Sequence, residues 1–470
     1  MMIFSVIFGS PLQLSGAHII WSVFAFFLIF VIAGICTSVL KYAIWRRKIS
    51  QNIPSVKLKT RFSSLLGFMR ELSLTKKGRN GQTILAFAHQ LLLKHAKLLE
   101  QEKLYCEWLF FYPVIVLSKA EAVEVLYGGT KSIEIPFFFT DFRISFLETA
   151  SVLETICGVD VRAQKSEKKT VPFVNSINRA FRLFVRRILN PLLWPDFLFY
   201  ASETGREVKK CSQVAKGFIR DLMEKEKQKI LEPSQDSEMK GMSLLKLLLN
   251  RYYSSEAMGE EEIIDHLMMF MIAGQDTTKI ALIWILYMLG LHADIRAKVH
   301  EELDLIFGED YERHATVEDM KNLKYLERVI KETLRLYPPL PVLARYLNED
   351  TTTCGYQIPK GTTCVVFPLV LHRDEKVFLN PEKFDPDRFL PENSASRHPY
   401  AYIPFGAAPR NCIGQKLAFM ELLIVTPTIL RRYTVESLDP RDQVLPVLTF
   451  ALSSSKPIRI RIRKRHTKKN

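Results

Sequence analysis

A cysteine in a loop rich in glycine and proline carries the strongest signal for chemistry in this sequence. Cys412 lies in the run Pro404–Gly414 (PFGAAPRNCIG), directly before the apolar segment Gln415–Arg432, which is expected to form a helix. Free N–H groups at a helix N-terminus favour a thiolate over a thiol and lower the pKa of the sulfur. Arg410 adds a fixed positive charge nearby. We therefore expect Cys412 to be a metal ligand; a buried, unreactive cysteine is the common alternative.

Two further groups of polar residues interrupt segments that are otherwise apolar. Ala273–Thr278 (AGQDTT) lies inside the run Glu260–Leu291, although glycine, aspartate and threonine are poor choices in a helix interior. Such a violation indicates a functional role, and the alternative is a threonine that hydrogen-bonds to its own helix backbone. Glu332 and Arg335 are three residues apart and so share one helix face. Alone, this pair carries little information.

Together these groups resemble the motifs of the cytochrome P450 family, in the order in which that family presents them. The loop resembles the heme-binding signature Phe-x-x-Gly-x-Arg-x-Cys-x-Gly, with Ala408 where the family usually has glycine. An alanine there introduces strain if the position needs a left-handed backbone. The resemblance implies that Cys412 is the thiolate ligand of a heme iron, an arrangement that favours O–O cleavage. The run Asn190–Phe197 (NPLLWPDF) is most similar to the clan of microsomal fatty-acid omega-hydroxylases.

The resemblance implies a set of cofactor-binding residues around Cys412. Phe405 and Arg410 belong to the signature, while Gly406 and Gly414 leave room for the backbone to approach a flat, bulky group. Arg345 stands where similar proteins place an arginine on a heme propionate. An exposed surface arginine is the alternative for this position.

On the oxygen side, the resemblance places the stretch around Gly274 over the heme. Gly274 would leave space for oxygen, and Thr277 and Asp276 are the expected catalytic residues, which would relay protons. Some members of the omega-hydroxylase clan bond a glutamate covalently to heme at the position of Ala273, so a non-covalent heme is expected here.

The resemblance also implies a structural network and a substrate pocket. Glu332, Arg335 and Arg388 are expected to form a buried network on the heme side of the core, in which losing one partner leaves a costly unpaired charge. The expected apolar pocket beside the iron is lined by Pro341–Ala344, Met269–Ala273 and Thr449–Leu452.

The pattern of apolar residues predicts a mainly α fold with a small β region, preceded by one transmembrane helix, and the resemblance implies that this is the cytochrome P450 fold. Predicted helices cover Gln82–Gln101, Ser118–Leu126, Glu203–Lys229, Glu260–Leu291, Ile295–Phe307, Leu326–Leu336 and Gln415–Arg432. Predicted strands cover Val114–Leu117, Thr363–Pro368 and Ile458–Arg463. Glu232–Lys240 is expected to be a surface loop. The predicted division is an anchor at 1–48 and a heme-binding domain at 49–470, internally shortened near 128–146.

The apolar run Ile19–Leu40 is free of charge and long enough to cross a hydrocarbon core of roughly 30 Å. Four cations follow it, at Lys41, Arg46, Arg47 and Lys48, which places the rest of the chain in the cytosol by the positive-inside rule. We expect a single-pass anchor in the endoplasmic reticulum membrane, and a polar stretch at Gln51–Lys59 that leads to the body. A cleaved signal peptide is the alternative.

Charge and cysteine content narrow the classes of partner. The 65 Lys and Arg against 50 Asp and Glu give a net charge of +15, which suits an acidic protein, an anionic membrane or nucleic acid. No nucleic-acid recognition module is found, and no nucleic-acid partner is expected. The basic C-terminus would also fit a nuclear-targeting run. Seven scattered cysteines, without a Cys-x-x-Cys pair, indicate a reducing compartment rather than a disulfide framework.

The expected activity is a monooxygenase reaction that uses O2 and electrons from NADPH, delivered by the flavoprotein reductase of the P450 system, on a fatty acid, steroid or foreign compound. No Trp-x-x-x-Arg sequence occurs in the chain, although family members use such a helix to grip a heme propionate. A non-catalytic or heme-deficient membrane protein is therefore the second hypothesis. An interior proline, Pro427, in the helix after Cys412 is a further departure from a regular pattern.

Overall fold

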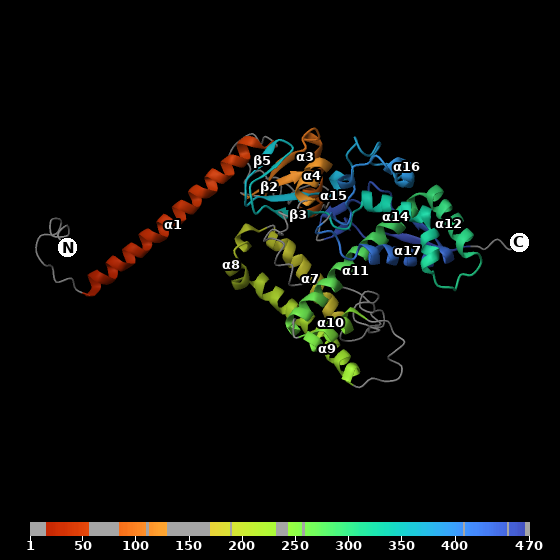
Figure 1. The fold of residues 1–470 in the computed structure, drawn as a ribbon, viewed down its shortest axis with the longest axis horizontal. Helices are drawn as coiled ribbons and strands as arrows, with labels where there is room; N and C mark the ends of the chain where they lie inside the picture. The colour runs from red at the N-terminus through yellow and green to blue at the C-terminus, as the bar shows by residue number, and fades with distance from the viewer. Residues whose placement is uncertain are drawn as a thin grey trace, which may run out of the picture.

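The computed structural model describes residues 16–55, 84–109, 112–128, 170–188, 190–231, 243–255, 259–407, 409–448 and 451–465. A long N-terminal helix reaches away from a body in which most of the remaining helices and all strands are gathered (Figure 1). The α-helices are α1 (Gly16–Asn52), α3 (Ile84–Leu98), α4 (Ala120–Tyr127), α7 (Thr170–Ile188), α8 (Asp196–Ala201), α9 (Glu203–Leu231), α10 (Leu244–Ser255), α11 (Glu260–Leu291), α12 (Ala293–Phe307), α13 (Val317–Asn322), α14 (Lys324–Leu336), α15 (Pro368–Leu371), α16 (Pro391–Ser394) and α17 (Gln415–Arg432), with short 3-10 turns at η2 (Pro191–Leu193), η4 (Pro386–Phe389) and η5 (Pro399–Ala401).

The largest sheet has four strands in the order β1 (Leu104–Leu109), β2 (Tyr112–Leu117), β6 (Thr363–Val366) and β3 (Leu343–Tyr346). Strands β2 and β6 are parallel, with Ile115 opposite Cys364, and the other two pairs are antiparallel. Three antiparallel pairs complete the β structure: β4 (Thr351–Thr353) with β5 (Tyr356–Ile358), β7 (Tyr433–Ser437) with β10 (Ile460–Lys464), and β8 (Pro446–Leu448) with β9 (Leu452–Ser454).

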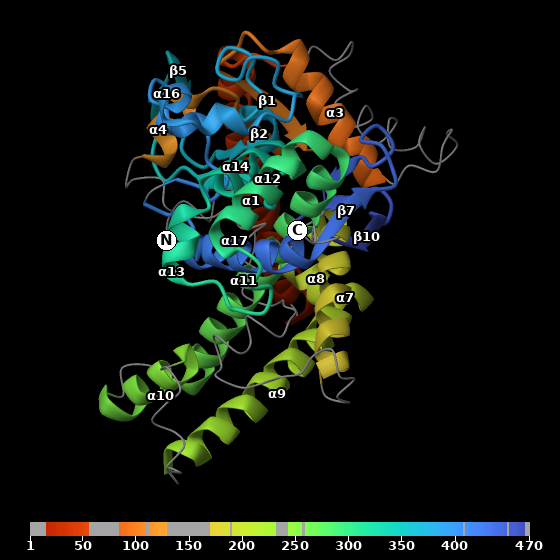
Figure 2. The same cartoon turned by 90° about the vertical axis from the view of Figure 1, so that its right-hand side faces the viewer.

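The main core is built around α11, which packs against α14, α17 and β7. Trp284 of α11 stacks on Tyr337 with ring centroids 4.0 Å apart, and its indole N–H donates to the Leu452 carbonyl at 3.0 Å. In Figure 2, α9 and α10 extend away from this core. A second cluster, formed by α7, α9, α10 and the first half of α11, buries Phe173, Ile219 and Leu267. Helix α11 thus connects the two clusters.

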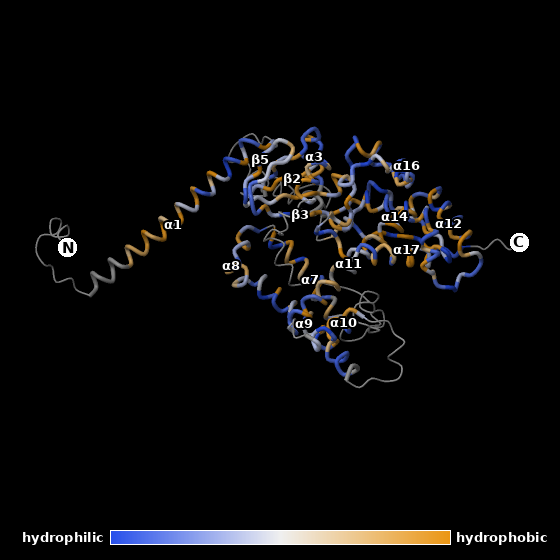
Figure 3. The backbone as a smooth tube through the Cα atoms, in the orientation of Figure 1, coloured by the Kyte–Doolittle hydropathy of each residue, from blue (hydrophilic) through white to orange (hydrophobic). Residues whose placement is uncertain are grey.

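Two helices are long and apolar enough to cross a membrane, in the part of the chain that the structure describes. The stretch Phe24–Asn52 of α1 has no buried residue in its most apolar window, whereas α11 is partly buried as the core helix just described. Figure 3 shows the middle of α1 as hydrophobic, with hydrophilic residues appearing where the helix approaches the body. Composition and exposure therefore single out α1 as the candidate anchor.

The predicted fold class is confirmed. Each of the seven predicted helices corresponds to an observed one, and α11 and α17 have the predicted bounds. The three predicted strands correspond to β2, β6 and β10. Helices α7 and α10 were not predicted. The loop predicted at Glu232–Lys240 lies outside the described residues, as does the shortened region near 128–146 beyond Gly128.

Helix α1 runs through the predicted boundary at residue 48, and Ile49 is fully buried in the body. Helix α17 continues through Pro427, which is buried among core residues although it lacks an N–H to donate. Among the described residues, the six cysteines are all free thiols.

Candidate functional site

The loop before α17 is held in a tight bend by its own backbone. The Cys412 N–H donates to the Phe405 carbonyl at 2.8 Å, and the Gly406 N–H donates to the Ile403 carbonyl at 3.0 Å. Gly406 has a φ of +75°, a left-handed conformation that disfavours any side chain. Phe405 packs against Phe419 of α17, with ring centroids 5.8 Å apart. These contacts present Cys412 at the end of the loop, three residues before the first residue of α17.

Cys412 is an exposed residue, so the alternative of a buried, unreactive cysteine does not hold. Desolvation of its sulfur nevertheless raises the pKa of the thiol, and the hydrogen bond from the Gly414 N–H lowers it by less. The lowered pKa predicted from the sequence is therefore wrong for the thiol by itself, because one N–H group does not outweigh the loss of water. A coordinated metal ion would keep the sulfur deprotonated in any case. The Cβ of an alanine at position 414 would lie 3.8 Å from this sulfur, so Gly414 keeps its surroundings open.

Arg345 of β3 lies beside this loop and is buried, with 8% of its surface exposed. Its guanidinium donates to the Ala344 carbonyl at 2.9 Å and to the Arg410 carbonyl at 3.4 Å, and it lies 4.2 Å from the centre of the Tyr127 ring. No acidic side chain pairs with it among the described residues. Burial lowers the pKa of Arg345, and the charge of Arg410 acts in the same direction. The alternative of a surface arginine is thus excluded, and this cation lacks a counter-charge in the part of the chain that the structure describes.

The polar motif of α11 satisfies its hydroxyl groups within the helix. The Thr277 hydroxyl donates to the Ala273 carbonyl at 2.7 Å, and the Thr278 hydroxyl donates to the Gly274 carbonyl at the same distance. Asp276 forms an ion pair with Lys279 at 2.5 Å. Ala273 itself is exposed. The structure therefore shows the bonding that the alternative for Thr277 predicts, and it leaves the oxygen of this hydroxyl free to accept a second hydrogen bond.

Glu421 of α17 is a residue of this region that the sequence did not single out. Its carboxylate hydrogen-bonds with Thr278, and burial raises its pKa while this bond lowers it by less. The contact joins the helix that follows Cys412 to the helix that carries the polar motif. Its position nine residues after Cys412, on the face of α17 turned to α11, emerges only once the two helices are packed.

The structure confirms the predicted contacts among Glu332, Arg335 and Arg388. Arg335 and Glu332 have fully buried side chains and form two hydrogen bonds of 2.7 and 2.8 Å. The Arg388 guanidinium lies 3.4 Å from the Glu332 carboxylate, and the Asp385 N–H donates to this carboxylate at 2.9 Å. Arg335 also donates to the His372 carbonyl at 2.9 Å. The buried charges are therefore paired and hydrogen-bonded, as burial requires.

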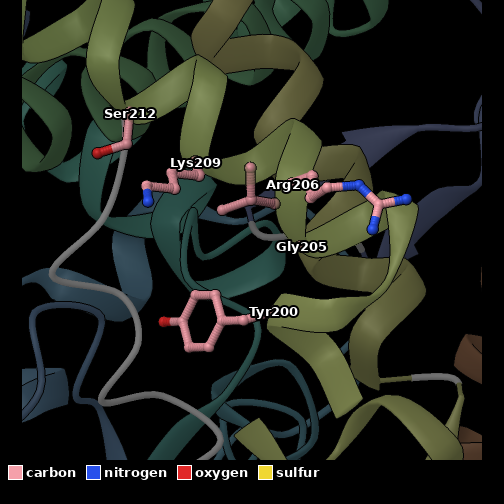
Figure 4. Close-up of a pocket in the computed structure, with 6 residues that line it drawn as sticks. Tyr200, Gly205, Arg206, Lys209 and Ser212 are labelled. Carbon is pink, nitrogen blue, oxygen red and sulfur yellow. The ribbon is translucent and has the colours of Figure 1, made fainter. Parts of the chain in front are cut away.

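The described residues of the predicted pocket differ in how far they are buried. Met269 is exposed, whereas Leu452 is fully buried and its N–H donates to the Pro339 carbonyl at 2.8 Å. Thr449 and Phe450 lie outside the described residues. A pocket of about 410 Å³ lies along α8 and α9. It is lined by Tyr200, Gly205, Arg206, Val208, Lys209 and Ser212 (Figure 4).

Several residues predicted to serve one site do come together. The loop brings Cys412, Phe405, Gly406 and Gly414 into one bend. Arg345 of β3 contacts this loop at the Arg410 carbonyl, although the two residues are 65 positions apart in the sequence. The Arg410 side chain is exposed. The motif at Thr277 and Asp276 is linked to α17 through the Thr278–Glu421 contact. The arrangement offers an exposed cysteine, a buried cation in contact with the same loop, and polar groups on the neighbouring core helix.

Comparison with known proteins agrees with this arrangement. The family model "Cytochrome P450" matches residues 138–462. Human cytochrome P450 4V2 is 38% identical over 336 residues, which cover 69% of this chain and 63% of that protein. Cytochrome P450 4c21 of Blattella germanica is 35% identical over 340 residues, 70% of this chain and 67% of that protein.

The solved structure described as the cytochrome P450DA heme domain superimposes with a TM-score of 0.70 at 19% sequence identity, covering 88% of this chain and 98% of that one. At this identity the likeness shows the fold alone. The chain spans 63% of the length of the human relative that it matches. The match of the family model over more than half of the sequence shows that the chain belongs to the cytochrome P450 family.

Proposed function

We propose that this protein is a heme-thiolate monooxygenase that hydroxylates a lipophilic substrate with O2 and electrons from a reductase. One observation carries the proposal: the loop that presents the exposed Cys412 is also contacted by the buried Arg345. This arginine has no acidic partner among the described residues. A heme offers both an iron for the sulfur and carboxylates for the arginine. The residues present therefore fit this cofactor.

Each residue of the loop would have a distinct part in holding the heme. Cys412 would be the iron ligand, and Arg345 and Arg410 would face the propionates. Gly406, with its positive φ, would allow the bend that brings the backbone close to the macrocycle, and Phe405 would fix the loop against α17. When bound, a heme with thiolate ligation supplies the activation of O2 and the transfer of one oxygen atom.

Thr277 and Asp276 would serve proton delivery in the reaction. The Thr277 hydroxyl donates to its own helix, so its oxygen can accept a hydrogen bond from a ligand or water in the site. Asp276 is held by Lys279 and would have to exchange this ion pair to pass a proton. Alanine at position 273 offers no carboxylate for a covalent bond, which supports a non-covalent heme.

The protein would be anchored in the endoplasmic reticulum membrane by α1, as a single-pass protein with its body in the cytosol. The apolar, exposed stretch from Phe24 and the cations that follow it support this placement. The electron donor would be the NADPH-dependent reductase of the P450 system, whose acidic surface a net charge of +15 suits. Fatty acids, steroids and foreign compounds are the proposed substrate classes.

A second function, a membrane protein that does not retain heme, is favoured by one observation. The chain has no Trp-x-x-x-Arg sequence and spans only part of the length of its human relative, so one support for a propionate is missing. Arg345 and Arg410 would then be the remaining cations for the propionates, and under this second function they would not suffice to retain the heme.

Reconstitution of the full chain with a flavin reductase tests the proposed reaction. The purified protein and reductase would be supplied with NADPH, oxygen-18 gas and a panel of fatty acids and steroids, and the products would be analysed by mass spectrometry. We expect one oxygen-18 atom in the product, dependent on both reductase and NADPH. A preparation that binds stoichiometric heme and substrate but yields no labelled product would contradict the monooxygenase assignment. A preparation that never takes up heme would support the second function.

A further inference from the structure

Helix α1 does not end in a free linker but continues into the body and packs there. Ile49, in the last turn of α1, is 0% exposed, and Ile53, the first residue after the helix, is 4% exposed; the Ile53 N–H donates to the Ile49 carbonyl at 3.1 Å. Just beyond the helix, the Cys106 N–H donates to the Pro54 carbonyl at 2.7 Å, and Ser55 pairs with Cys106 in a parallel bridge. The chain thus passes from the apolar helix directly onto the edge of the sheet. A polar stretch was predicted at Gln51–Lys59. Its first residues, which the structure describes, form the packed end of this helix.

Two aromatic contacts and one hydrogen bond fix the same end of α1. The Trp45 indole N–H donates to the Lys360 carbonyl at 3.1 Å, and the Trp45 ring lies 6.0 Å from the ring of Tyr112. The Arg46 guanidinium lies 4.6 Å from the centre of the Trp108 ring. We call this contact region the anchor joint; it comprises Trp45, Arg46 and Ile49 of α1 and Ile53 just after it, with Trp108, Tyr112 and Lys360 of the body.

The depth of the anchor joint follows from the geometry of a helix and a bilayer. The hydrocarbon core is about 30 Å thick within a bilayer of about 40–45 Å, which leaves roughly 5–8 Å of headgroup layer on each side. A helix rises about 1.5 Å per residue. If Ile19–Leu40 fills the core, Trp45–Lys48 lies about 8–12 Å beyond Leu40, at the outer border of the headgroup layer with water. Because the joint has no free linker, the body residues that it contacts lie at the same depth.

The side chains around the joint are of the kinds that membrane interfaces favour. Tryptophan and tyrosine concentrate at this level, and lysine and arginine are attracted to anionic headgroups. Lys41, Arg47, Lys48 and Lys360 are exposed, on surfaces that the joint does not cover. Within the described ranges, none of the four side chains forms an ion pair with an acidic residue.

We propose that the anchor joint is a lipid-binding surface, which holds this face of the body at the outer border of the headgroup layer while Lys41, Arg47, Lys48 and Lys360 bind the phosphates of anionic phospholipids. The proposal rests on the membrane anchorage proposed above. It goes beyond that anchorage because a helix on a free linker would leave the body unoriented. A docked helix end gives the body a fixed tilt and brings the β4–β5 hairpin, next to Lys360, to the membrane surface.

Fluorescence quenching at two positions of the full chain tests this placement. A fluorescent amino acid would be introduced at position 357 in β5, near the joint, or at position 305 in α12, where Leu305 is 88% exposed. The protein would be inserted into phosphatidylcholine vesicles that carry a quencher on the headgroup, with and without phosphatidylserine. We expect strong quenching at position 357, little at position 305, and about a twofold gain at position 357 with phosphatidylserine.

The cations are tested by a charge variant and a matched control. The triple variant Arg47→Gln, Lys48→Gln, Lys360→Gln is expected to lose the gain from phosphatidylserine. The control Arg461→Gln, Arg463→Gln, Lys464→Gln removes the same number of exposed charges from β10 and is expected to retain the gain. If both variants retain the gain, or neither does, the named cations are not the phosphate-binding groups.

Extraction with alkaline carbonate separates the two proposals. If the chain resists extraction but positions 357 and 305 are quenched equally, the anchorage stands and the anchor joint does not lie at the headgroup layer. If carbonate releases the chain, the anchorage itself is wrong and the lipid-binding surface with it. Retention together with quenching confined to position 357 supports both.

Discussion

The Nε2 atom of His372 accepts a hydrogen bond from the Ile403 N–H at 2.9 Å. His372 is fully buried, and its carbonyl accepts a hydrogen bond from Arg335, while Ile403 lies one residue before the loop that presents Cys412. One histidine therefore connects the buried Glu332–Arg335 pair to the start of the loop. Its Nδ1 atom has no hydrogen-bond partner among the described residues.

This histidine should make stability fall in mildly acidic solution. Burial, aided by the charge of Arg335, lowers the pKa of His372 from 6.5 to about 3. Below pH 6.5 the unfolded chain binds a proton that the folded chain does not, so the contribution is complete above pH 6.5 and decreases toward pH 3, by about 1.4 kcal/mol per pH unit. His372→Gln keeps an acceptor without titrating. We expect the unfolding free energies of the wild type and this variant to converge from pH 7 to pH 4, and parallel curves would contradict the assignment.

The Glu332–Arg335 pair should be intolerant of losing one partner. Glu332→Gln leaves two guanidinium groups, of Arg335 and Arg388, beside a neutral amide in a buried site. We expect a loss of about 3–5 kcal/mol in unfolding free energy. Glu318→Gln is the control, because its ion pair with Lys321 is exposed and should contribute less than about 1 kcal/mol. Denaturant unfolding of both variants measures the contrast; similar losses would show that burial of the first pair is incomplete.

Two glycines of α9 should respond to alanine in opposite directions. The Cβ of an alanine at position 205 would overlap with the Phe199 carbonyl oxygen, whereas nothing lies within 4 Å at position 217. Gly205→Ala should therefore separate α8 from α9 and destabilise the protein. Gly217→Ala should stabilise it by about 0.5–1 kcal/mol, because alanine restricts the unfolded chain. Thermal unfolding followed by circular dichroism checks both signs, and stabilisation by both variants would show that α8 does not approach α9 closely.

Arg345 should matter more for heme retention than for folding. Arg345→Gln removes a buried charge for which the described residues supply no counter-charge, so the unfolding free energy without heme should stay the same or rise. Its loss should speed the transfer of heme to apomyoglobin about tenfold, as expected for a charge-assisted hydrogen bond of about 1.4 kcal/mol. Arg463→Gln, on the exposed strand β10, should change neither quantity. An unchanged rate of heme transfer for Arg345→Gln would remove this arginine from the site.

The sequence predicted the long core helices well because their apolar residues recur with a regular spacing. Helix α7 was missed although Phe173, Ile177, Ala180 and Leu183 form its buried face, at intervals of four, three and three residues. That signal was present, but the arginines interspersed with it obscure the apolar face in a linear reading. The hydroxyl of Thr277 bonds within its own turn, so the sequence could indicate this alternative without a tertiary structure.

The remaining site features depend on contacts between distant segments. Arg345 meets the loop carbonyl of Arg410 across 65 residues, and His372 meets Ile403 across 31. Neither the burial of Arg345 nor the role of His372 follows from local pattern. The pKa of Cys412 was predicted in the wrong direction for the same reason, because the helix N-terminus is a local feature and desolvation depends on the surrounding fold.

The most direct test of the account is the absorbance of the reduced protein with carbon monoxide, measured on the full chain in membranes for the wild type and Cys412→Ser. Thiolate ligation gives a characteristic red-shifted band. Cys106→Ser, at a buried cysteine of β1, is the control. We predict the red-shifted band in the wild type and in Cys106→Ser, and its loss in Cys412→Ser. A heme-loaded Cys412→Ser protein that retains the band would contradict the assignment of Cys412 as the iron ligand.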